Sequence, residues 1–598
     1  MRRAGRRAPS SGAPWSFPPP WVRSWQREGL AGDVSAGLVV AIMLVPQSLA
    51  YALLAGLPPQ VGLMASLLPV LGYAAFGSSG ALSVGPAAIT SLMVAQALTP
   101  LAAPGSAAYG ALAALLALGS GLLLMLMGRL RLGFLSQLLS RPVVQGFTVA
   151  SALLIMAGQV APLLGWQPGA RGALDTLRVW RDHLSWQDGW PHLQLQSGDA
   201  VIGVGALVLL WVGPKWLTWL ARVLGWRDSV IQIAGRLWPL AVLVLTSVGA
   251  FWLKGADLGP SLGHFFGPVA LVGAVSVQLD GATQSLALAW QQPWAAWSDL
   301  LMPVLLISLL TFVSSMSVAQ TFALQHGERI DADRELLGLG LANVGSAVLG
   351  GLAVSGGLSR SVVNDAAGAR TPLAGVITAV ILAALLFACL PWLAYLPKAA
   401  LAALIIMAGV GLVQFAPLRD AWRYDRADAW AFISTALGVM LMGFEAGILL
   451  GIAWSLGAMI WRHSQPHMAE VGRLPGTEHF RNVQRYEVEQ LDSILMVRVD
   501  ESLDFTNIQR VELRLCELIH ARGHIERIVL LLSAVNHIDH SAMQTLLELD
   551  AALADQGKTL YLAEVKGPVM DRLQSCRIDK RFEGRIFMSA QHAWDALV

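Results

Sequence analysis

The sequence predicts an all-α polytopic membrane domain followed by a small α/β domain. Of its 598 residues, 55% are hydrophobic and only 13% are charged, whereas roughly a quarter of the residues in an average soluble domain are charged. The mean hydropathy is +0.57, and apolar runs follow one another from about residue 35 to residue 462. Charged residues then return at the density of a soluble domain. We therefore expect a leader at 1–30, a transmembrane domain at 31–465 and a cytoplasmic domain at 466–598.

Charge, cysteines and short motifs exclude several classes of protein. The net charge of +2 is too small to indicate a nucleic-acid partner. The three cysteines form no paired framework and no metal-ligand spacing. Gly557-Lys558-Thr559 resembles the end of a phosphate-binding loop, but Ala552 replaces the earlier glycine that such a loop requires. We expect no metal, no cofactor and no enzymatic activity.

The first thirty residues predict a cytoplasmic leader. Four arginines stand within the first seven residues, and a stretch rich in proline, serine and glycine follows. The leader has no apolar core of the kind that a cleavable signal needs. Its tryptophans suit the boundary between membrane and water; they are Trp15, Trp21 and Trp25.

Twelve apolar runs are long enough to cross a bilayer as helices. Two further segments, about 84–99 and 357–367, are too short or too rich in glycine and serine to span alone. The even total of fourteen places both termini on one side, and the arginine clusters of four connections then fall in the cytoplasm. The loop of about 166–197 is placed outside although it holds three arginines. The twelve runs are about 35–56, 61–77, 107–128, 142–165, 198–222, 235–254, 299–325, 336–352, 371–392, 397–414, 427–443 and 444–462.

The two broken segments hold the same rank when the fourteen are divided seven and seven, because each is third in its half. Short or interrupted segments at matching positions of two halves are typical of a transporter's binding site. In the first, Pro86 suits the first turn of a helix and Gly85 lets the backbone approach a ligand. In the second, two glycines precede Ser359 and Arg360. If both half-helices start near one another, each offers unpaired N–H groups and about half a positive charge to the same space.

Arg360 gives the strongest single indication of an anion site. A charged side chain near the centre of a bilayer costs roughly 2.5–3.5 kcal/mol, so an intramembrane arginine indicates a functional site. The alternative is that the two breaks are kinks or close helix contacts; their matching rank and the arginine favour a site. In the first span, Gln47 and Tyr51 are four residues apart and share a helix face. They either donate hydrogen bonds to a bound oxyanion or serve helix packing.

Several distinctive motifs accompany these features. They stand at 36–41, 45–47, 55–59, 61–63, 83–86, 335–338, 341–343, 358–361 and 367–371. On these motifs the chain resembles the sulfate permease (SulP) family of anion transporters over nearly its whole length. The resemblance implies two intertwined inverted repeats of seven helices, arranged as a core and a gate, a homodimer, and an elevator-like movement of the core. It also implies an anion site made of Gln47, Tyr51, Pro86, Ala87, Ser359 and Arg360.

The chain departs from that family's pattern at one position. Many bacterial members that resemble cation-coupled symporters carry a carboxylate in the eighth helix, where this chain has Ser314 or Ser315. Serine does not titrate in the relevant range and is a weak sole ligand for sodium. We therefore expect anion exchange, facilitated diffusion, or coupling through a carboxylate elsewhere, for which Glu445 is a candidate.

The polar tail alternates between strand and helix patterns. Strands are expected at 493–499, 527–532 and 559–565, and helices at 505–519 and 542–553. The tail resembles a STAS domain (sulfate transporter and anti-sigma antagonist). Relatives place a serine that can be phosphorylated where this chain has Ser541, and a phosphate at a helix N-terminus is electrostatically favourable. Alternatively, Asp539 and Ser541 only cap the helix.

The leading expectation is secondary or exchange transport of small anions, with sulfate as the family default, across the inner (cytoplasmic) membrane. A bicarbonate or chloride carrier is the nearest alternative. A nucleobase permease of the same architecture is a second alternative, against which Arg360 and the polar domain argue. A third is a sensor that binds an anion without carrying it. The expected partners are a small inorganic anion, the lipid bilayer and a second copy of the chain, with no nucleic acid.

Overall fold

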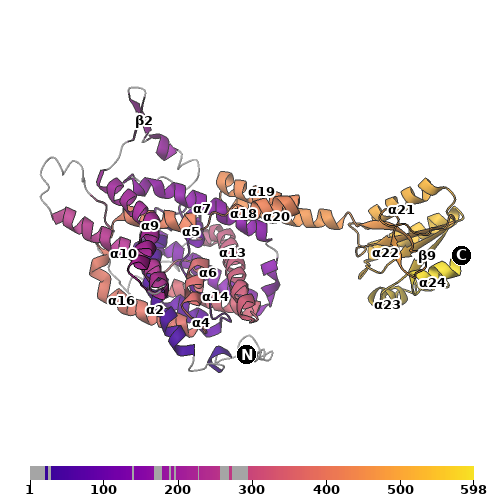
Figure 1. Cartoon of the computed structure of the whole chain (residues 1–598), viewed down its shortest axis with the longest axis horizontal. Helices are drawn as coiled ribbons and strands as arrows, with labels where there is room; N and C mark the ends of the chain where they lie inside the picture. Colours follow the sequence, from indigo (N-terminus) through magenta and orange to yellow (C-terminus); the bar gives the residue numbers. More distant parts are fainter. Residues whose placement is uncertain are drawn as a thin grey trace. The chain divides into compact units, whose positions relative to one another are not determined.

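The computed structural model describes residues 20–23, 29–137, 140–166, 178–182, 184–187, 190–193, 197–226, 228–255, 269–272 and 294–598. Nearly all of the predicted leader and much of the loop at 166–197 lie outside these residues. The chain divides into two compact units, Met1–Trp454 and Ser455–Val598 (Figure 1). Each unit has a hydrophobic core of its own.

The helices of the first unit follow the predicted spans, except that the span at 61–77 is divided into α3 and α4, and that α20 continues beyond the end of the unit at Trp454. Among the described residues are also elements that the sequence did not predict: α1 (Pro20–Arg23), the short 3-10 helix η2 (Leu132–Gln137), α18 (Ala416–Tyr424), and the hairpin of β2 (Leu184–Gln187) with β3 (Trp190–Leu193). The expected helices are α2 (Leu30–Leu54), α3 (Pro59–Met64), α4 (Leu68–Phe76), α5 (Ala88–Leu98), α6 (Ala107–Arg129), α7 (Arg141–Leu163), α9 (Ser197–Val223), α10 (Asp228–Gly255), α13 (Trp294–His326), α14 (Ala332–Val348), α15 (Leu358–Ala366), α16 (Leu373–Leu393), α17 (Lys398–Val410), α19 (Arg426–Met442) and α20 (Phe444–His463).

Six stretches of helix among the described residues are long and apolar enough to cross a membrane by length and composition. One of them, Pro59–Phe76, is interrupted, because α3 ends at Met64 and α4 begins at Leu68. The sequence predicted one unbroken span there. Pro69 in the first turn of α4 explains the break, since proline has no N–H to continue the hydrogen bonds of a preceding helix.

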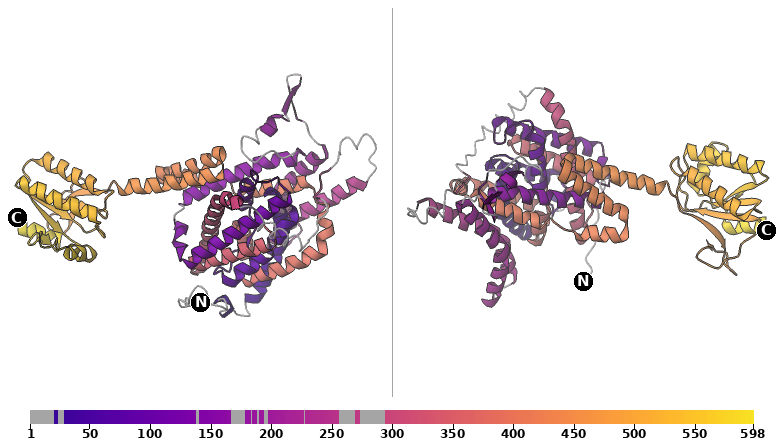
Figure 2. Two further views of the ribbon diagram at one scale, coloured as in Figure 1. Left: turned by 180° about the vertical axis from the view of Figure 1, so that it is seen from behind. Right: turned by 90° about the horizontal axis from the view of Figure 1, so that it is seen from above.

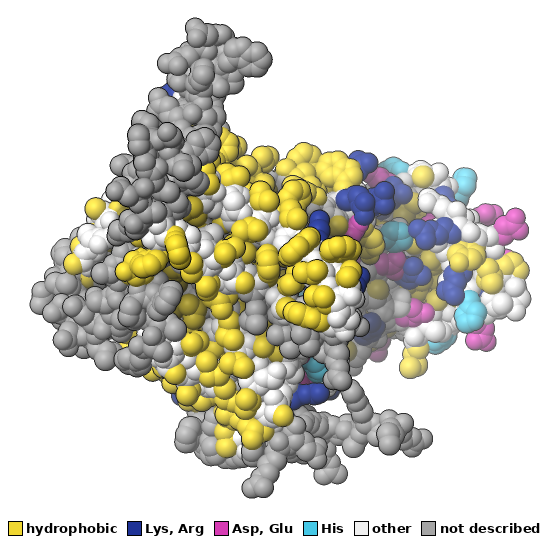
Figure 3. Space-filling view, turned by 60° about the vertical axis from the view of Figure 1, so that its left-hand side comes forward, with side chains coloured by type: hydrophobic (Ala, Val, Ile, Leu, Met, Phe, Trp, Pro, Cys, Tyr) yellow, Lys and Arg dark blue, Asp and Glu magenta, His cyan; other side chains and the backbone are white. Residues whose placement is uncertain are grey.

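The outer face of the helical unit is apolar. Large hydrophobic side chains of α9 and α10 are exposed, among them Trp211, Trp216, Trp219 and Trp252. Figure 3 shows hydrophobic side chains over this unit, whereas charged side chains gather on the C-terminal unit. Such a surface suits lipid, because exposed apolar patches of this extent are rare on soluble monomers.

Small residues let helices inside the unit approach closely. Helices α6 and α14 pack together along their length. A Cβ atom added to Gly121 would lie 2.8 Å from the carbonyl oxygen of Gly340, and one added to Gly340 would lie 2.6 Å from the Met125 side chain. Backbone contact of this kind is how membrane helices associate, since lipid gives them no hydrophobic drive to pair.

The C-terminal unit is a six-stranded sheet with helices on both faces (Figures 1 and 2). Strands β7, β8, β9 and β10 are parallel, and β5 is antiparallel to both β6 and β7. The three strands that the sequence predicted are β7, β8 and β9; the other three are additional. The strand order is β10 (Ile586–Phe587), β9 (Thr559–Ala563), β8 (Arg527–Leu531), β7 (Ile494–Val499), β5 (Met468–Arg473) and β6 (Phe480–Asn482).

Alternate side chains of the central strands enter two separate cores. Leu495 and Val497 of β7 lie in one core with the apolar faces of α21 (Ile508–Arg522), α22 (His540–Asp555) and α23 (Gly567–Ser575). Ile494 and Met496 point to the other face and pack with α24 (Ala590–Leu597). This two-residue alternation is the expected consequence of a pleated strand.

Candidate functional site

The two broken segments meet inside the helical unit as a short antiparallel strand pair. Strand β1 (Val84–Gly85) pairs with β4 (Ser355–Gly356), with Val84 opposite Gly356. The Gly357 N–H also donates to the carbonyl of Ser83 at 3.0 Å. Helices α5 and α15 begin within three residues of the pair, at Ala88 and Leu358. The two helix N-termini therefore start from one place, which is the condition under which both could act on one ligand.

Arg360 lies against this strand pair and is only 2% exposed. Its Nη1 donates to the carbonyl oxygen of Pro86, and its Nη2 donates to that of Ser355 at 3.3 Å. One acceptor thus comes from each broken segment. The Nε atom of Arg360 is buried without a hydrogen-bond partner among the residues that the structure describes. No carboxylate is found in hydrogen-bond or ion-pair contact with the guanidinium within that part of the chain, so its positive charge is not neutralised there.

Two glycines lie beside the guanidinium, and only Gly357 leaves space that a Cβ atom would take. A Cβ atom at Gly357 would lie 2.9 Å from Nη2 of Arg360, which is too close for an unstrained contact. A Cβ atom at Gly85 would lie 3.5 Å from the same nitrogen, an ordinary van der Waals distance. An alanine at position 357 would therefore displace the guanidinium.

Two polar side chains outside the predicted site, Ser361 and Asn364, fix the strand pair. The Ser361 hydroxyl accepts from the Ser83 N–H at 3.0 Å and donates to the Gly357 carbonyl at 2.8 Å. Asn364 donates to the Ala81 carbonyl at 3.0 Å. Sequence reasoning did not single them out, although polar residues one turn apart on a short intramembrane helix would have been a usable signal.

Helix α2 brings Tyr51 to the arginine. Helix α15 packs against α2, and α2 packs against α5. Tyr51 is 9% exposed and lies close enough to Arg360 for an electrostatic interaction. Gln47, one turn earlier, is half-buried. The structure thus brings Tyr51, Pro86 and Arg360 together, with Gln47 on the neighbouring turn of the same helix.

The remaining predicted site residues lie at the starts of the two half-helices. Ala87 is the half-buried N-cap residue of α5. The expectation that Pro86 occupies the first helical turn is wrong, because α5 begins at Ala88; Pro86 instead presents its carbonyl to Arg360. Ser359 is exposed, in the first turn of α15. Its backbone N–H, in the first helical turn, has no acceptor within the helix.

The two serines of α13 differ in their surroundings. Ser315 is fully buried, and its hydroxyl accepts a hydrogen bond from the Gly356 N–H at 2.8 Å. Ser314 is half-buried and donates to the Thr311 carbonyl of its own helix at 3.3 Å. Glu445, the carboxylate that the sequence analysis considered for coupling, is exposed in the first turn of α20. It does not lie in the buried region around the strand pair.

In the C-terminal unit, Asp539 is the N-cap of α22, and its carboxylate accepts from the Ala542 N–H at 2.7 Å. Ser541 follows in the first turn with an exposed side chain. The cap is therefore made by Asp539 alone. Among the described residues, no three histidine, cysteine, aspartate or glutamate side chains are grouped so that they could hold a metal ion.

Two broken helices that meet over a buried arginine, within a bundle of apolar helices, define a membrane transport protein of the broken-helix class. Residues 30–435 match the model of the sulfate permease family, and residues 485–593 match the STAS domain. The chain belongs to the sulfate permease family, whose members are transporters and not enzymes, and carries a C-terminal STAS domain.

Curated relatives and solved structures agree with this assignment. The chain is 33% identical to "Sulfate transporter 4.1, chloroplastic" of Arabidopsis thaliana over 547 residues, covering 88% of this chain and 74% of the relative. It is 30% identical to a probable sulfate transporter of Mycobacterium tuberculosis (strain CDC 1551 / Oshkosh) over 577 residues, covering 96% of each. The structure of SLC26A9 shares the fold, with a TM-score of 0.81 at 18% identity, over 96% of this chain and 91% of that one.

Proposed function

We propose that the protein carries small anions, sulfate in the first place, across a membrane and binds them at the starts of α5 and α15 above Arg360. The observation that carries this proposal is the strand pair β1–β4. It joins the two broken segments beside an arginine that is 2% exposed and whose Nε lacks a partner among the described residues. The names of the curated relatives, which are sulfate transporters, support sulfate.

The charge of the site favours a dianion. Each helix N-terminus contributes about half a positive charge, and Arg360 contributes a whole one, so about two positive charges face the same space. Sulfate would balance them, whereas bicarbonate or chloride would balance about half. An uncharged nucleobase would leave the buried arginine without a counter-charge, which is unfavourable in a low-dielectric site.

We infer an elevator-like movement in which the broken segments travel with their anion past a gate. The support is the network that joins β1, β4, α13 and α15 into one body, through Ser315, Ser361 and Asn364. A homodimer with both termini in the cytoplasm and an inner-membrane location belong to the same proposal. They rest on the family and on the arginine distribution. Ser541, exposed at the start of α22, remains a candidate for regulatory phosphorylation.

Radiolabelled sulfate uptake into proteoliposomes tests the proposal, with Arg360→Ala as the decisive variant. This change removes the charge and the hydrogen bonds that Arg360 donates to the carbonyls of Pro86 and Ser355. Hydrogen bonds to charged groups are worth about 1.5–3 kcal/mol, so we expect kcat/KM for sulfate to fall by about 10- to 100-fold. Arg360→Lys keeps the charge but lacks the planar guanidinium whose two Nη atoms donate to the two carbonyls, and the variant should lie between the wild type and the alanine variant.

Competition separates the alternatives in the same vesicles. Excess sulfate, bicarbonate, chloride, nitrate or a dicarboxylate is added outside while uptake of labelled sulfate is followed. We expect unlabelled sulfate to inhibit the uptake of labelled sulfate more strongly than the other four anions do. Uptake of uracil without uptake of any inorganic anion would identify a nucleobase permease, and anion binding without flux would identify a sensor. Normal transport by Arg360→Ala would show that the assigned site is wrong.

A further inference from the structure

Two acidic side chains outside the anion site are completely buried in the helical unit. Asp33 near the start of α2 and Glu335 near the start of α14 are both 0% exposed. Neither forms an ion pair with a lysine, arginine or histidine among the residues that the structure describes. Burying a carboxylate without a cation is costly unless hydrogen bonds replace its water. Each acid must therefore be held by its hydrogen-bond donors.

The donors to Glu335 come from the segment that leads into β1. The Ser78 N–H and hydroxyl donate to Oε1 at 2.8 and 2.7 Å, and the Ser79 N–H donates to the same oxygen at 3.2 Å. The Tyr73 hydroxyl, at the end of α4, donates to Oε2 at 2.9 Å. Ser79 stands five residues before the first residue of β1. Glu335 thus anchors to α14 the stretch of chain that leads into the first broken segment.

The donors to Asp33 come from the segment that leaves α15. The N–H groups of Arg370 and Thr371 donate to Oδ1 at 2.7 and 3.1 Å, and the Thr371 hydroxyl donates to Oδ2 at 2.7 Å. Arg370 stands four residues after the end of α15. Asp33 therefore anchors to α2 the stretch of chain that leaves the second broken segment. Helix α2 also carries Gln47 and Tyr51.

We propose that Asp33 and Glu335 are positioning residues for anion binding. Each uses a carboxylate to anchor one broken segment to a continuous helix, and together they set where β1, β4 and Arg360 lie. Neither acid contacts the anion. This inference rests on the proposed function, because it assigns to the two anchors an effect on the site at Arg360.

The contacts favour an ionised carboxylate over a neutral polar side chain. The backbone N–H groups around the two acids can only donate, whereas the Tyr73, Ser78 and Thr371 hydroxyls can donate or accept. Glu335→Gln and Asp33→Asn keep the size and can keep the backbone contacts through the amide oxygen, but they remove the negative charge and place an NH₂ group against a hydroxyl, which must then accept instead of donate. Hydrogen bonds to a neutral acceptor are weaker than those to a charged one, so the anchored segment can shift, and the shift is passed to the strand pair.

The test is a measurement of KM and kcat for sulfate uptake by the full-length variants in proteoliposomes. Weakening one hydrogen bond to a charged group can change an equilibrium constant by about tenfold. Part of this loss should appear as weaker sulfate binding at the site, and so as a higher KM. We expect Glu335→Gln and Asp33→Asn each to raise KM about fivefold or more, while kcat changes less than about twofold. Glu335→Asp restores the carboxylate on a shorter stem and should recover part of the lost affinity.

Two further variants make the result decisive. Glu328→Gln, an exposed acid on the loop before α14, is the matched control and should keep the wild-type KM. If Glu335→Gln does not fold, Tyr73→Phe keeps the carboxylate, removes one donor and should still raise KM by about twofold or more. The inference is wrong if wild-type uptake is present and KM is unchanged in the folded variants at positions 33, 73 and 335. Missing wild-type uptake would instead contradict the proposed function.

Discussion

Arg360 has two tasks at once. It joins the two broken segments by donating to the Pro86 and Ser355 carbonyls, and it supplies the buried positive charge of the proposed site. These tasks are compatible because a carbonyl oxygen satisfies a guanidinium N–H without neutralising its charge, and arginine has five N–H donors to distribute. A change that displaces the guanidinium should therefore affect both the strand pair and anion affinity.

Two glycine substitutions test this at the residue scale. Gly357→Ala places a Cβ atom 2.9 Å from Nη2 of Arg360, whereas Gly85→Ala places one at 3.5 Å from the same atom. Neither glycine has a positive φ angle, so alanine meets no backbone strain at either position. We expect Gly357→Ala to raise KM for sulfate by about tenfold, equivalent to about 1.4 kcal/mol. Gly85→Ala should stay within about twofold of wild type.

KM for sulfate is measured for the two variants at equal protein amounts in proteoliposomes. The thermal unfolding of each variant is checked in detergent. Because both variants add the same methyl group in the strand pair or directly after it, a general loss of flexibility would affect them alike. Equal KM values for the two variants would show that anion affinity does not depend on the position of the guanidinium.

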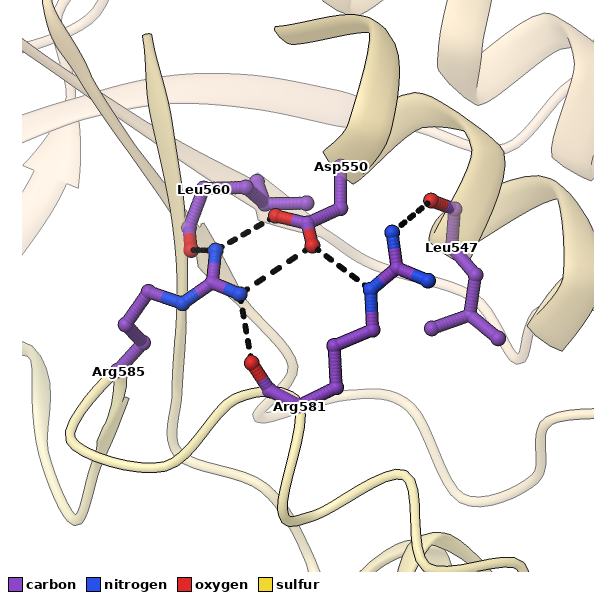
Figure 4. A network of polar contacts seen from close by, with 5 residues as sticks. All are labelled: Leu547, Asp550, Leu560, Arg581 and Arg585. Atoms are coloured by element: carbon purple, nitrogen blue, oxygen red, sulfur yellow. Dashed lines mark hydrogen bonds and ion pairs between the residues drawn. The ribbon is translucent and has the colours of Figure 1, made fainter. Parts of the chain in front are cut away.

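At the scale of elements, the C-terminal unit is tied together by one buried carboxylate. Asp550 of α22 has only 5% of its side chain exposed and accepts from Nη1 of Arg585 at 2.6 Å and from Nε of Arg581 at 3.3 Å (Figure 4). Arg585 also donates to the Leu560 carbonyl of β9 at 3.2 Å. The network therefore connects α22, β9 and the segment that precedes β10.

Asp550→Asn should destabilise this unit. Removing one partner of a buried ion pair typically costs about 3–5 kcal/mol, but the Arg581 side chain is 46% exposed and can return to water. We therefore expect a loss of about 2–3 kcal/mol, seen as faster amide hydrogen exchange in α22 and β9 of the full-length protein. Glu517→Gln removes an exposed pair with Arg514 and should cost less than about 0.5 kcal/mol. Equal exchange in the two variants would contradict the assignment.

The sequence was informative about elements because elements depend on local patterns. Apolar length and the Gly/Ser breaks at 77–88 and 354–364 predicted the helices and the rank of the broken segments, and the structure confirms them apart from the division of the second span into α3 and α4 and the unpredicted α18. Pro86 shows the limit of local reasoning. Its missing N–H suits a first helical turn, yet the strand pairing of β1 delays the start of α5 to Ala88. That pairing depends on a segment about 270 residues away, which no local pattern reports.

Side-chain partners of the site could not be predicted for the same reason. In the sequence, Ser315 stood at a possible coupling position that lacks a carboxylate. In the structure, its hydroxyl accepts a hydrogen bond from the Gly356 N–H, 41 residues later in the chain. Ser78 and Glu335 are separated by 257 residues, and Asp33 and Thr371 by 338. Hydrogen bonds over such separations follow from the fold as a whole. The residue types were visible in the sequence, but their partners were not.

At the scale of the whole molecule, the open question is what drives the anion across the membrane. A titratable carboxylate in α13 would tie anion entry to a proton or sodium gradient, but this helix has Ser314 and Ser315 at the corresponding position. The hydroxyl of Ser315 is already engaged by backbone, and that of Ser314 by its own helix. Glu445 is exposed. At this position α13 therefore offers hydroxyls and no carboxylate for coupling.

We expect the rate of sulfate uptake to be independent of imposed proton and sodium gradients. Proteoliposomes are loaded with potassium buffer, and inward proton or sodium gradients are applied separately while the membrane potential is clamped with valinomycin. Initial rates should change by less than about twofold, because serine neither titrates in this range nor suffices as a sole sodium ligand. Preloading with unlabelled sulfate should accelerate uptake if the protein exchanges anions. A severalfold acceleration by either cation gradient, abolished in Ser314→Ala, would show that the hydroxyl does take part in coupling.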